Sequence, residues 1–529
     1  MALDRRDALI LLALLAGAGL YAATLVTWAP HPFEDAAILM RYAQHVAEGH
    51  GIVWNVGGRP VDGATDFLFM LLIAGLARCG MTVDTAVRLV AIGSHFLTVA
   101  IVYAAVRRTG GAARWMAALS AAYLAVGPGL RYASAWFGTP FFALFACAAW
   151  YFANRLAKEE DSGAHGLGFT LCGLAMGLTR PEGVFLAVFM LAAIVYWRGW
   201  GPTRRIIATF VLVFAALGGA YFVWRWHYFG HPLPNPYYKK GGGELHWYAL
   251  RSAVQGALRF TLPFTLPFIA AFRSREAARK AVFALIPIVG FVAIWVLVSD
   301  AMNYLWRLQY ALVPLVVMSW PPLVEGVFAE WRLPRWRDLE RKSRVTLAVL
   351  GSIVFVWVLV YNHRMSRLPI KFGDGNYTIA TTLRDYAGKG YTMAVTEAGL
   401  LPYYSRWKAL DTWGLNDPWI ARHGIVTDAY LREKHPELIM FHAYFSAVTK
   451  PHVSNDWDAM VMVLKDYAER NGYILAGDFG ETPNDTFFYY VRPDFADSAT
   501  IIRRIREADY TWMSTGAKCL NFAMLRRVD

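Results

Sequence analysis

Charged residues are scarce in this chain. Asp, Glu, Lys and Arg make up 17% of its 529 residues, whereas hydrophobic residues make up 57% and aromatic residues 15%. Soluble globular domains ordinarily contain about 25% charged residues. The composition therefore excludes an ordinary soluble protein and predicts one that crosses a membrane many times.

The chain has only four cysteines and shows no internal symmetry. Cys79, Cys147 and Cys172 lie in or beside apolar segments, and only Cys519 lies in the polar C-terminal part. A disulfide bond within that part is impossible, so the cysteines do not indicate a redox compartment. No internal repeat or low-complexity linker is visible, and the chain lacks the symmetric halves of many secondary transporters.

Acidic residues are outnumbered by basic ones. The chain has 52 Lys and Arg against 39 Asp and Glu, which gives a net charge of +13. Most of the basic residues form short clusters between apolar runs, where the positive-inside rule expects them. This distribution favours cytoplasmic loops of a membrane protein and argues against a nucleic-acid ligand.

Apolar runs long enough, or nearly long enough, to cross a bilayer predict about eleven transmembrane helices. The first run follows Arg5 and Arg6 and has no convincing cleavage site, so we expect it to be retained as a helix. The runs are residues 9–28, 86–106, 112–130, 134–153, 166–179, 184–197, 204–226, 260–272, 280–298, 304–320 and 344–362.

The short apolar run at residues 67–77 decides the predicted topology. At about 1.5 Å per residue it covers barely half of a bilayer core, so we interpret it as a helix lying on the outer membrane surface. All five basic clusters then become cytoplasmic, and the N-terminus lies inside. These clusters are Arg107/Arg108/Arg114, Arg155/Lys158, Arg198/Arg204/Arg205, Arg273/Arg275/Arg279/Lys280 and the basic residues within 332–344.

The C-terminal part does not resemble a membrane segment. Apolar, β-rich stretches at residues 391–395, 438–442 and 487–491 alternate with helical patterns at 458–471 and 501–509. This alternation predicts a soluble α/β domain. We therefore expect a transmembrane domain over residues 1–362 and an extracytoplasmic α/β domain over 363–529, which is periplasmic in a bacterial inner membrane.

The polar motifs of the membrane part all fall on the predicted outer side. They are residues 34–66, "SAWFGTP" at 134–140, "LTRPEG" at 178–183, "HYFGHPLPNPYYKKGGG" at 227–243 and "SDAMNYLWR" at 299–307. Two adjacent carboxylates, Glu34 and Asp35, follow the first predicted span. The cations Arg180, Lys239, Lys240 and Arg307 lie at the ends of later spans.

A carboxylate near several cations at a membrane surface suits glycosyl transfer from a lipid phosphate. The carboxylate takes the proton of an acceptor hydroxyl as that hydroxyl attacks the anomeric carbon. The cations stabilise the charge that develops on the leaving phosphate.

Each of these residues also has a structural interpretation. Asp35 could cap a helix that ends at Gly49, and Arg180 and Arg307 could be interfacial anchors. Lys239 and Lys240 could belong to a solvated loop, and Asn416, Asp417 and Pro418 could form a turn. His31, His50, His227 and His231 could ligate a metal, although their spacing matches no known site.

Five segments carry a resemblance to a known superfamily. They are "EDAAILMRYAQHVAEGHGIVWNVGGRPVDGATDFLFMLL", "LTRPEG", "LPNPYYKKGG", "SDAMNYLWRLQYALVP" and "TEAGLLPYYSRWKALDTWGLNDPWIARHG". In their order and spacing they resemble the GT-C superfamily of polyprenyl-phosphate-sugar-dependent glycosyltransferases. The most similar branch is the one containing the mycobacterial terminal β-(1→2)-arabinofuranosyltransferase, and the similarity covers about residues 30–425.

The resemblance implies a role for each matching residue. Asp35 becomes the catalytic base, Glu34 the first acid of its motif, and residues 67–77 the membrane-surface helix. Arg41 and Tyr42 complete the first motif, and Arg41 is expected to help keep Asp35 ionised. The expected substrate-binding residues are Arg41, Tyr42, Asn235, Tyr238, Asp300, Tyr404, Asn416 and Asp417. The later motifs also match the family at Arg180, Lys239 and Arg307, and the segment that includes Tyr403 and Asp411 resembles the family's C-terminal domain.

The chain also departs from the family pattern at two places. Gly138 stands where relatives often have an acid before "TP", and Gly63, Ala64, Thr65 and Asp66 replace the common "GY(T/S)N". These changes affect the identity of the sugar and of the acceptor more than the overall chemistry.

The function predicted from these observations is that of an inverting membrane glycosyltransferase. It moves a sugar, with arabinofuranose suggested by the resemblance, from a polyprenyl phosphate to a glycan, glycolipid or protein hydroxyl of the cell envelope. A divalent cation is compatible with this chemistry but not required by it. The alternatives are a lipid or solute transporter, which would place ionisable groups at mid-bilayer, and a non-catalytic glycan-binding membrane protein.

Overall fold

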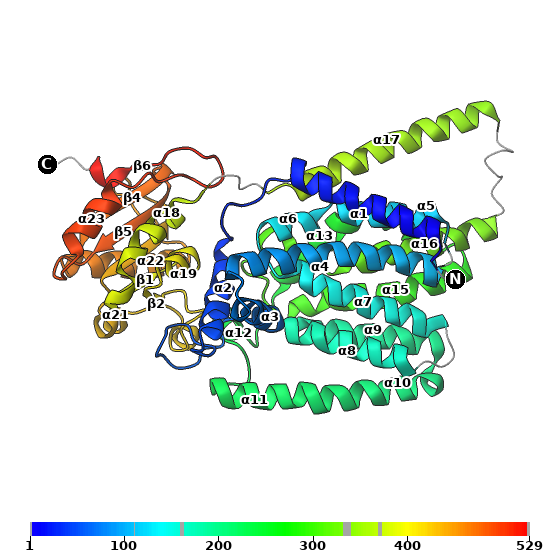
Figure 1. Cartoon of the computed structure of the whole chain (residues 1–529), viewed down its shortest axis with the longest axis horizontal. Coiled ribbons are helices and arrows are strands. Elements are labelled where there is room, and N and C mark those ends of the chain that lie inside the picture. The colour runs from blue at the N-terminus through cyan, green and yellow to red at the C-terminus, as the bar shows by residue number, and fades with distance from the viewer. Residues whose placement is uncertain (1–2, 111, 159–162, 332–339, 369–372, 526–529) are drawn as a thin grey trace.

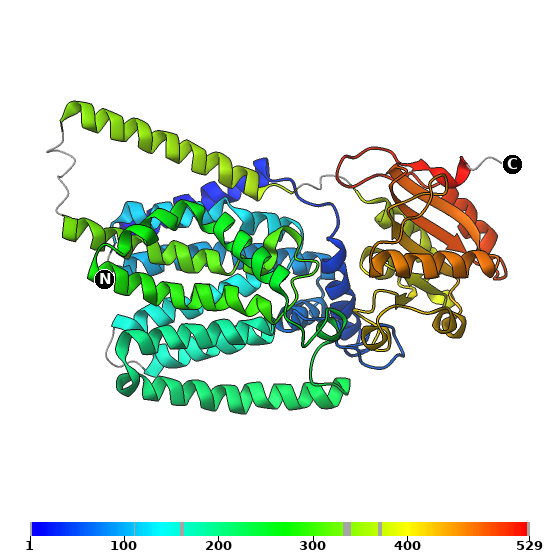
Figure 2. The ribbon, with the colours of Figure 1, turned by 180° about the vertical axis from the view of Figure 1, so that it is seen from behind.

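The computed structural model consists of a helical bundle followed by a smaller part built around a β-sheet (Figure 1). The structure describes residues 3–110, 112–158, 163–331, 340–368 and 373–525. The N-terminus lies at the bundle end farthest from the sheet-containing part, which we call the tail domain and which begins after helix α17 (Figures 1 and 2).

Most of the bundle helices overlap the predicted apolar runs, but helix α13 (Trp247–Thr261) lies mostly before the run at 260–272 and is not predicted. Their bounds are α1 Arg5–Leu25, α4 Val83–Ala105, α5 Arg114–Ala125, α7 Thr139–Lys158, α8 Gly163–Thr179, α9 Glu182–Arg198, α10 Trp200–Val213, α11 Gly219–Phe229, α13 Trp247–Thr261, α14 Thr265–Ala271, α15 Arg275–Ala293, α16 Leu312–Trp331 and α17 Arg341–Ser366. The predicted class, a mostly helical protein with a C-terminal sheet domain, is thereby confirmed.

The predicted number of eleven spans stays a prediction. Within the described residues five helical segments are long and apolar enough to cross a membrane: Arg5–Leu25, Val83–Arg108, Trp200–Phe229, Arg275–Val296 and Arg341–Ser366. Other runs form shorter helices. Proline explains two of them, because Pro128 begins a separate helix, α6 (Pro128–Ser134), and Pro263 lies in a 3₁₀ turn between α13 and α14.

Helices α2 (Glu34–Ala47) and α3 (Phe67–Arg78) lie across one end of the bundle. In Figure 1, α2 stands upright and α3 is seen close to end-on, whereas the long helices run along the horizontal. The α3 helix has 12 residues and buries Phe69, Met70 and Ile73. This is the orientation expected of a helix on a membrane surface, as predicted for residues 67–77.

The described basic clusters gather at the opposite end of the bundle, near the N-terminus. Arg107 forms an ion pair with Asp7 at 2.8 Å, and Arg114 contacts Asp7 at 3.3 Å. Arg279 donates to the carbonyl of Trp197 at 2.6 Å, which joins α15 to α9. Residues 332–339 of the fifth cluster lie outside the described residues. The clusters and the tail domain thus occupy opposite ends, although the membrane face of each stays a prediction.

The tail domain contains a six-stranded mixed sheet in the order β2-β1-β3-β5-β4-β6. The strands are β1 Thr392–Val395, β2 Lys408–Asp411, β3 Leu438–Ala443, β4 Ile474–Thr482, β5 Asp485–Val491 and β6 Leu520–Asn521. The helices are α18 Gly375–Leu383, α19 Leu400–Ser405, α20 Ile420–His423, α21 Asp428–Lys434, α22 Asp456–Arg470 and α23 Ser498–Arg506. The three predicted strands match β1, β3 and β5, and the helix predicted at 501–509 begins three residues earlier.

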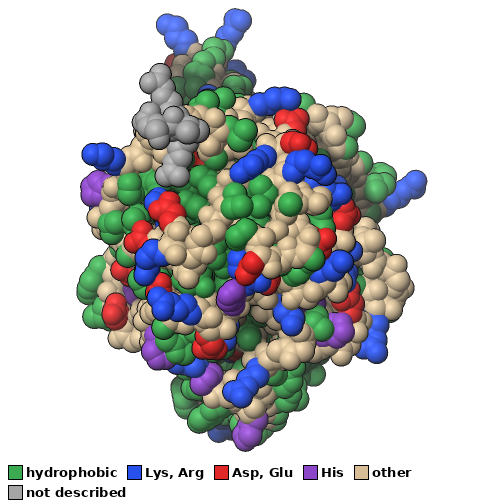
Figure 3. Space-filling model, turned by 90° about the vertical axis from the view of Figure 1, so that its left-hand side faces the viewer, with side chains coloured by type: hydrophobic (Ala, Val, Ile, Leu, Met, Phe, Trp, Pro, Cys, Tyr) green, Lys and Arg blue, Asp and Glu red, His purple; other side chains and the backbone are tan. Residues whose placement is uncertain are grey.

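Alternating side chains place the sheet between two cores. Met393 and Val395 of β1 belong to the same buried cluster as residues of the bundle, whereas Ala394 belongs to a second cluster with Ile439 and Phe441. This is the period of two expected of a strand buried on both faces. The outward side of the tail domain carries interspersed basic and acidic side chains (Figure 3).

The loops that follow the parallel strands contact the bundle. Strands β1, β2 and β3 are parallel neighbours, so the loops that follow them leave the same edge of the sheet. Glu34 of α2 contacts Gly399, after β1, and Tyr42 contacts Asn416, after β2. The carboxyl edge of parallel strands is where α/β proteins usually bind ligands. Here that edge lies against α2.

Candidate active site

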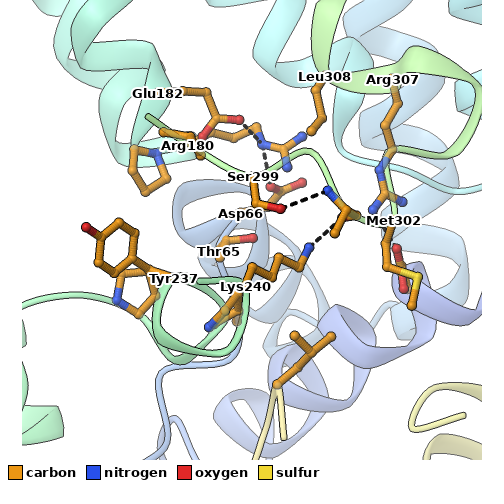
Figure 4. Close-up of a pocket in the computed structure, with 18 of the residues that line it drawn as sticks. Thr65, Asp66, Arg180, Glu182, Tyr237, Lys240, Ser299, Met302, Arg307 and Leu308 are labelled. Carbon is orange, nitrogen blue, oxygen red and sulfur yellow. Dashed lines mark hydrogen bonds and ion pairs between the residues drawn. The ribbon is translucent and has the colours of Figure 1, made fainter. Parts of the chain in front are cut away.

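A cavity of about 410 Å³ lies at the bundle end next to α2, and Leu415 of the tail domain contributes to its lining. Its wall is largely apolar, with Ile38, Phe137, Phe185 and Trp295 among its residues. Its charged residues come from five chain segments: Asp35, Asp66, Arg180, Glu182, Lys240 and Arg307. Figure 4 shows all of these except Asp35 as labelled side chains around one space. Of the predicted site residues, Asp35, Arg180, Lys240 and Arg307 are therefore brought together.

Asp35 lies in the first turn of α2 and faces the cavity. The residue that caps this helix is Phe33, which makes no side-chain capping bond. The interpretation of Asp35 as an N-cap is therefore wrong. Its Oδ2 instead accepts a hydrogen bond from Arg307 Nη2 at 2.5 Å, and the Asp35 side chain is 33% exposed.

Arg307 is directed at Asp35 by an unusual turn. Leu305 and Trp306 have φ values of 56° and 58°, a region that residues other than glycine seldom adopt. The Tyr132 hydroxyl donates to the Leu305 carbonyl at 2.5 Å and supports this backbone. The Arg307 guanidinium stacks over Phe137 at 4.4 Å and is 13% exposed, so it does not extend to solvent as an interfacial anchor would.

Lys240 brings a second cation to the same space. It follows the short helix α12 (Asn235–Lys239), and its Nζ donates to the carbonyl of Ala301 at 2.7 Å. Burial lowers the pKa of Lys240 to about 8, although the nearby charge of Asp35 opposes this change. The ammonium is therefore close to losing its proton just above neutral pH.

Arg180 is the third cation. It lies between α8 and α9, where Pro181 interrupts the helix, and its Nε is 3.2 Å from Asp66 and 3.0 Å from Glu182. Burial acts to lower the pKa of Arg180, but the carboxylates of Asp66 and Glu182 outweigh it and raise the pKa. Arg180 therefore stays charged within the cavity wall.

The sequence pattern does not single out Asp66 and Glu182 as site residues. Asp66 stands out only as a departure from the family motif, and Glu182 lies inside "LTRPEG". The available signal is that one acid follows Arg180 by two residues and the other directly precedes the short apolar helix α3. Neither spacing shows that the two acids meet the same arginine.

Glu34 does not line the cavity, although it is next to Asp35. Its Oε1 accepts hydrogen bonds from the backbone amides of Gly399 and Leu400, the latter at 3.0 Å. Burial, together with the charges of Glu397 and Asp374, raises the pKa of Glu34 well above its ordinary value. Successive residues of a helix are rotated by about 100°, so the adjacent carboxylates face the tail domain and the cavity separately.

Arg41 also belongs to the contact with the tail domain. Its guanidinium donates to the carbonyls of Trp54 at 2.9 Å and Trp407 at 2.8 Å and to that of Pro402, and to Asn55 at 3.0 Å. The described hydrogen bonds of Arg41 therefore do not include Asp35, so any effect of its charge on Asp35 acts without direct contact.

Lys239 points away from the cavity that Lys240 lines. Its ammonium contacts the carbonyl of Gly424 and lies 4.0 Å from the ring centre of Trp413. Of these two predicted phosphate-binding residues, Lys240 lines the cavity and Lys239 does not, because the two side chains leave the backbone in different directions.

Seven predicted substrate-site residues lie outside the cavity lining: Tyr42, Asn235, Tyr238, Asp300, Tyr404, Asn416 and Asp417. The Tyr42 hydroxyl donates to Asn416 at 2.9 Å, and the Tyr404 hydroxyl donates to Asp84 at 3.2 Å. Asp417 accepts the amides of Trp419 and Ile420, which is the turn expected at this position. These contacts join the tail domain to the bundle or order its loops.

The remaining three lie close to the cavity, among its supporting residues. Asn235 is buried and its backbone amide donates to the Asp62 carbonyl at 3.0 Å, while Asp300 is buried beside Asn303. The guanidinium carbon of Arg422 lies 5.4 Å from the ring centre of Tyr238.

Among the described residues no three His, Cys, Asp or Glu side chains are grouped closely enough to hold a metal ion. His31 is buried, and its Nε2 accepts the backbone amide of Asp374 at 2.7 Å.

Comparison with known proteins gives a fold but no close relative. No curated protein matches the sequence. A family model described as "Domain of unknown function (DUF8728)" matches residues 366–499, which lie mostly in the tail domain.

Solved structures resemble the whole chain. ArnT from Cupriavidus metallidurans in the apo state is 16% identical with a TM-score of 0.54, over 90% of this chain and 97% of that one. The archaeal oligosaccharyltransferase AglB from Archaeoglobus fulgidus was solved in complex with an inhibitory peptide and a dolichol-phosphate. It is 12% identical with a TM-score of 0.51, over 92% of this chain and 75% of that one. The arabinofuranosyltransferase AftD from Mycobacteria is 15% identical with a TM-score of 0.52, over 94% of this chain but 40% of that one.

These three structures are of GT-C glycosyltransferases, so the fold implied by the sequence resemblance is confirmed. Sequence identities of 12–16% show only that the fold is shared.

Proposed function

We propose that this protein is a membrane glycosyltransferase that moves a sugar from a polyprenyl phosphate to a hydroxyl group. The observation that carries this proposal is the meeting of Asp35 with Arg180, Lys240 and Arg307 in one cavity. These four residues come from separate segments, and the cavity lies at the bundle end crossed by α2 and α3. The fold shared with GT-C structures supports the same conclusion.

Asp35 acts as the base in this proposal. One carboxylate oxygen is held by Arg307, and the side chain is exposed enough to meet an acceptor from the cavity. Asp35 takes the proton of the acceptor hydroxyl while the hydroxyl oxygen bonds to the anomeric carbon. The bond from that carbon to the phosphate oxygen breaks, and the configuration at the carbon inverts.

The cations receive the leaving phosphate. Arg307 contacts Asp35 directly, and Lys240 and Arg180 lie near enough for their charges to act on the same carboxylate. Each cation stabilises the negative charge that the phosphate gains as the bond breaks. Asp66 and Glu182 hold Arg180 in place and, together with Asp35, balance the three positive charges of the cavity.

The apolar wall suits the lipid portion of the donor. Ile38, Leu39, Phe185 and Val298 line the cavity beside the charged residues. A polyprenyl phosphate presents this combination, an apolar chain ending in an anionic group. The dolichol-phosphate named for the AglB structure belongs to that lipid class. Arabinofuranose is the sugar favoured here, by the motif resemblance and by the name of AftD.

We place the protein in a bacterial inner membrane with the tail domain in the periplasm. The basic clusters lie at the end of the bundle opposite the tail domain, and basic loops stay in the cytoplasm. The donor would then be used on the outer side, where envelope acceptors are found.

The decisive experiment compares Asp35→Asn with the wild-type protein. Cells lacking the gene are complemented with each form, and envelope glycans and surface proteins are analysed by mass spectrometry. The variant should fail to restore the missing glycan, with transfer by membrane preparations reduced by roughly two to four orders of magnitude. Its unfolding temperature should change little, because Asn has the same size and keeps an oxygen that can accept the hydrogen bond from Arg307.

Glu34→Gln is the matched control, since it alters the neighbouring carboxylate of the same helical turn. Its transfer rate should fall less than that of Asp35→Asn. A larger loss at Glu34 would identify Glu34 as the base instead, and near-normal activity of Asp35→Asn would refute the proposed mechanism.

A further inference from the structure

A second, more open cavity of about 580 Å³ lies on the tail domain beside the first. We call it the aromatic groove and define it by its six lining residues: Met302, Trp413, Tyr444, Asn455, Asp456 and Trp457. Met302 also lines the active-site cavity, and Leu415, two residues after Trp413, does so as well. The aromatic groove and the cavity that contains Asp35 therefore adjoin at Met302.

The two tryptophans of the groove are held in fixed positions. Their ring centres are 5.3 Å apart and their planes are inclined by 51°, so the two rings form an angled surface. The indole nitrogen of Trp457 donates to the His442 carbonyl at 3.0 Å. The ammonium of Lys239 lies 4.0 Å from the ring centre of Trp413. Such support keeps the rings in place before a ligand arrives, which lowers the entropy cost of binding.

Tyr444 leaves its ring open to solvent. It is 58% exposed, an unusual degree for a large aromatic residue that follows a buried strand. Tyr444 comes after β3 and Trp413 after β2, so both lie at the carboxyl edge of the parallel strands. The first turn of α22 adds Asp456 and Trp457. The sheet topology thus collects the aromatic rings at the edge where a ligand is expected.

The composition of the groove favours a neutral carbohydrate. A sugar ring has apolar C–H faces, which pack on aromatic rings, and hydroxyl edges, which bond to carboxylates and amides. Trp413, Trp457 and Tyr444 supply the rings, and Asp456 and Asn455 supply the polar groups. A purely apolar ligand would leave the Asp456 carboxylate without hydrogen-bond donors, whereas sugar hydroxyls can donate to it.

We propose that the aromatic groove binds the sugar units of the acceptor that adjoin the reacting hydroxyl. The inference rests on the proposed function and narrows it, because it makes the acceptor a glycan of several units. The distal units lie on Trp413, Trp457 and Tyr444, and the terminal unit passes Met302 to reach Asp35. Lys239, which does not line the active-site cavity, positions Trp413 in this scheme.

Binding is tested with the full-length protein in detergent, by ligand-detected NMR and calorimetry. The probes are linear tetrasaccharides of arabinofuranose, galactofuranose, mannose and glucose. The wild-type protein should bind at least one of them, and Tyr444→Ala and Trp457→Ala should each weaken that binding by about fivefold to tenfold. Tyr444→Ala is the safer variant for folding, because its ring is largely exposed.

Leu520→Ala is the matched control. Leu520 is 56% exposed, lies on β6 of the same domain and does not line the groove, so its removal should leave binding unchanged. Asp35→Asn should still bind the tetrasaccharide through the groove, because Asp35 does not line the groove. Absence of binding to all four probes, or equal binding by the wild-type and both aromatic variants, would overturn the proposal.

The two proposals fail in different ways. If the aromatic variants lose tetrasaccharide binding while Asp35→Asn remains active in transfer, the acceptor site in the groove is supported and the role of Asp35 as the base is refuted. If Asp35→Asn loses transfer while the aromatic variants keep normal tetrasaccharide binding and a normal acceptor KM, the role of Asp35 as the base is supported and the acceptor site in the groove is refuted.

Discussion

At the scale of single residues, neighbours in the sequence have different surroundings. Asp35 meets Arg307 in the cavity, whereas Glu34 accepts amides of the tail domain. Lys240 lines the cavity, whereas Lys239 covers Trp413. A charge within a motif therefore does not by itself indicate which function its side chain serves.

Arg307→Ala should reduce transfer strongly while the protein still folds. The guanidinium contacts Asp35 and, in the proposed mechanism, stabilises the leaving phosphate, so its loss should cost roughly 2–4 kcal/mol of transition-state stabilisation. Arg279→Ala is the matched control, because the Arg279 guanidinium also lies over an aromatic ring, 4.4 Å from the ring centre of Trp197, but at the opposite end of the bundle. Transfer rates of the purified variants decide the matter. A well-folded Arg307→Ala protein with wild-type turnover would reduce Arg307 to a structural residue.

Lys240 should make donor binding dependent on pH. Burial lowers its pKa to about 8 from the ordinary value of 10.5, so the ammonium carries its charge below pH 8 and loses it above. The KM for the lipid-phosphate donor should rise as the pH increases from 7 to 9. Lys240→Arg should remove most of this rise, because arginine stays protonated over that range. The same rise in both proteins would show that another group titrates.

At the scale of elements, α2 is the piece that connects the cavity with the tail domain. One side of this helix presents Asp35 to the cavity, while Glu34, Arg41 and Tyr42 bind loops of the tail domain. A single helix thus couples the position of the proposed base to the docking of the sheet edge.

The junction next to α2 should make stability dependent on pH. Burial, aided by the charge of Glu397 and opposed by the amide of Asn376 and by His442, raises the pKa of Asp374 to about 7 from 3.8. Between these two values the folded protein holds a proton that the unfolded chain releases. The resulting stabilisation is complete below about pH 4 and is lost as the pH rises through 7, with an upper limit of about 4 kcal/mol.

Asp374→Asn tests this dependence, because asparagine can keep the hydrogen bond with the Asn376 amide that caps α18. The unfolding temperature of the variant should fall less than that of the wild-type protein between pH 5 and pH 8. Glu34 titrates in the same direction, so part of the slope should remain. Asp428→Asn, which alters a partly exposed acid of α21, should leave the wild-type slope intact. An unchanged slope in Asp374→Asn would contradict the assignment.

At the scale of the whole molecule, the two ends of the bundle have different chemistry. The end near the N-terminus carries the described basic clusters, and the other end carries the cavity. Helices α2 and α3 and the tail domain lie at that second end (Figures 1 and 2). Such polarity is expected when donor binding and transfer take place on one side of a membrane.

Cysteine labelling should confirm the proposed orientation. In a background without the four native cysteines, Lys518→Cys in the tail domain should react with an impermeant maleimide added to intact cells. Glu276→Cys, at the opposite end of the bundle, should react only after the cells are opened. Both positions are well exposed, with side-chain exposures of 80% and 74%. Labelling of Glu276→Cys from outside would reverse the topology.

Much of the architecture follows from local patterns in the sequence. Apolar runs predict most of the bundle helices, and alternating β-rich stretches predict β1, β3 and β5. Both patterns are visible because buried side chains recur at a fixed spacing along a helix or strand. The short run that became α3 is recognisable from its length alone. Where proline divides a run, as at Pro128 and Pro263, the helices are shorter than the apolar stretch suggests.

The sequence by itself determined the membrane class, the alternation of apolar and basic segments, and the candidates Asp35, Arg180, Lys240 and Arg307. Only the tertiary structure decided that Arg307 pairs with Asp35 across 272 residues, that Asp66 and Glu182 hold Arg180, and that Glu34, Arg41 and Lys239 belong to the contact with the tail domain. The reason is physical. Periodicity and charge bias are local properties of a chain, whereas the direction of a side chain and its partner depend on how distant segments pack.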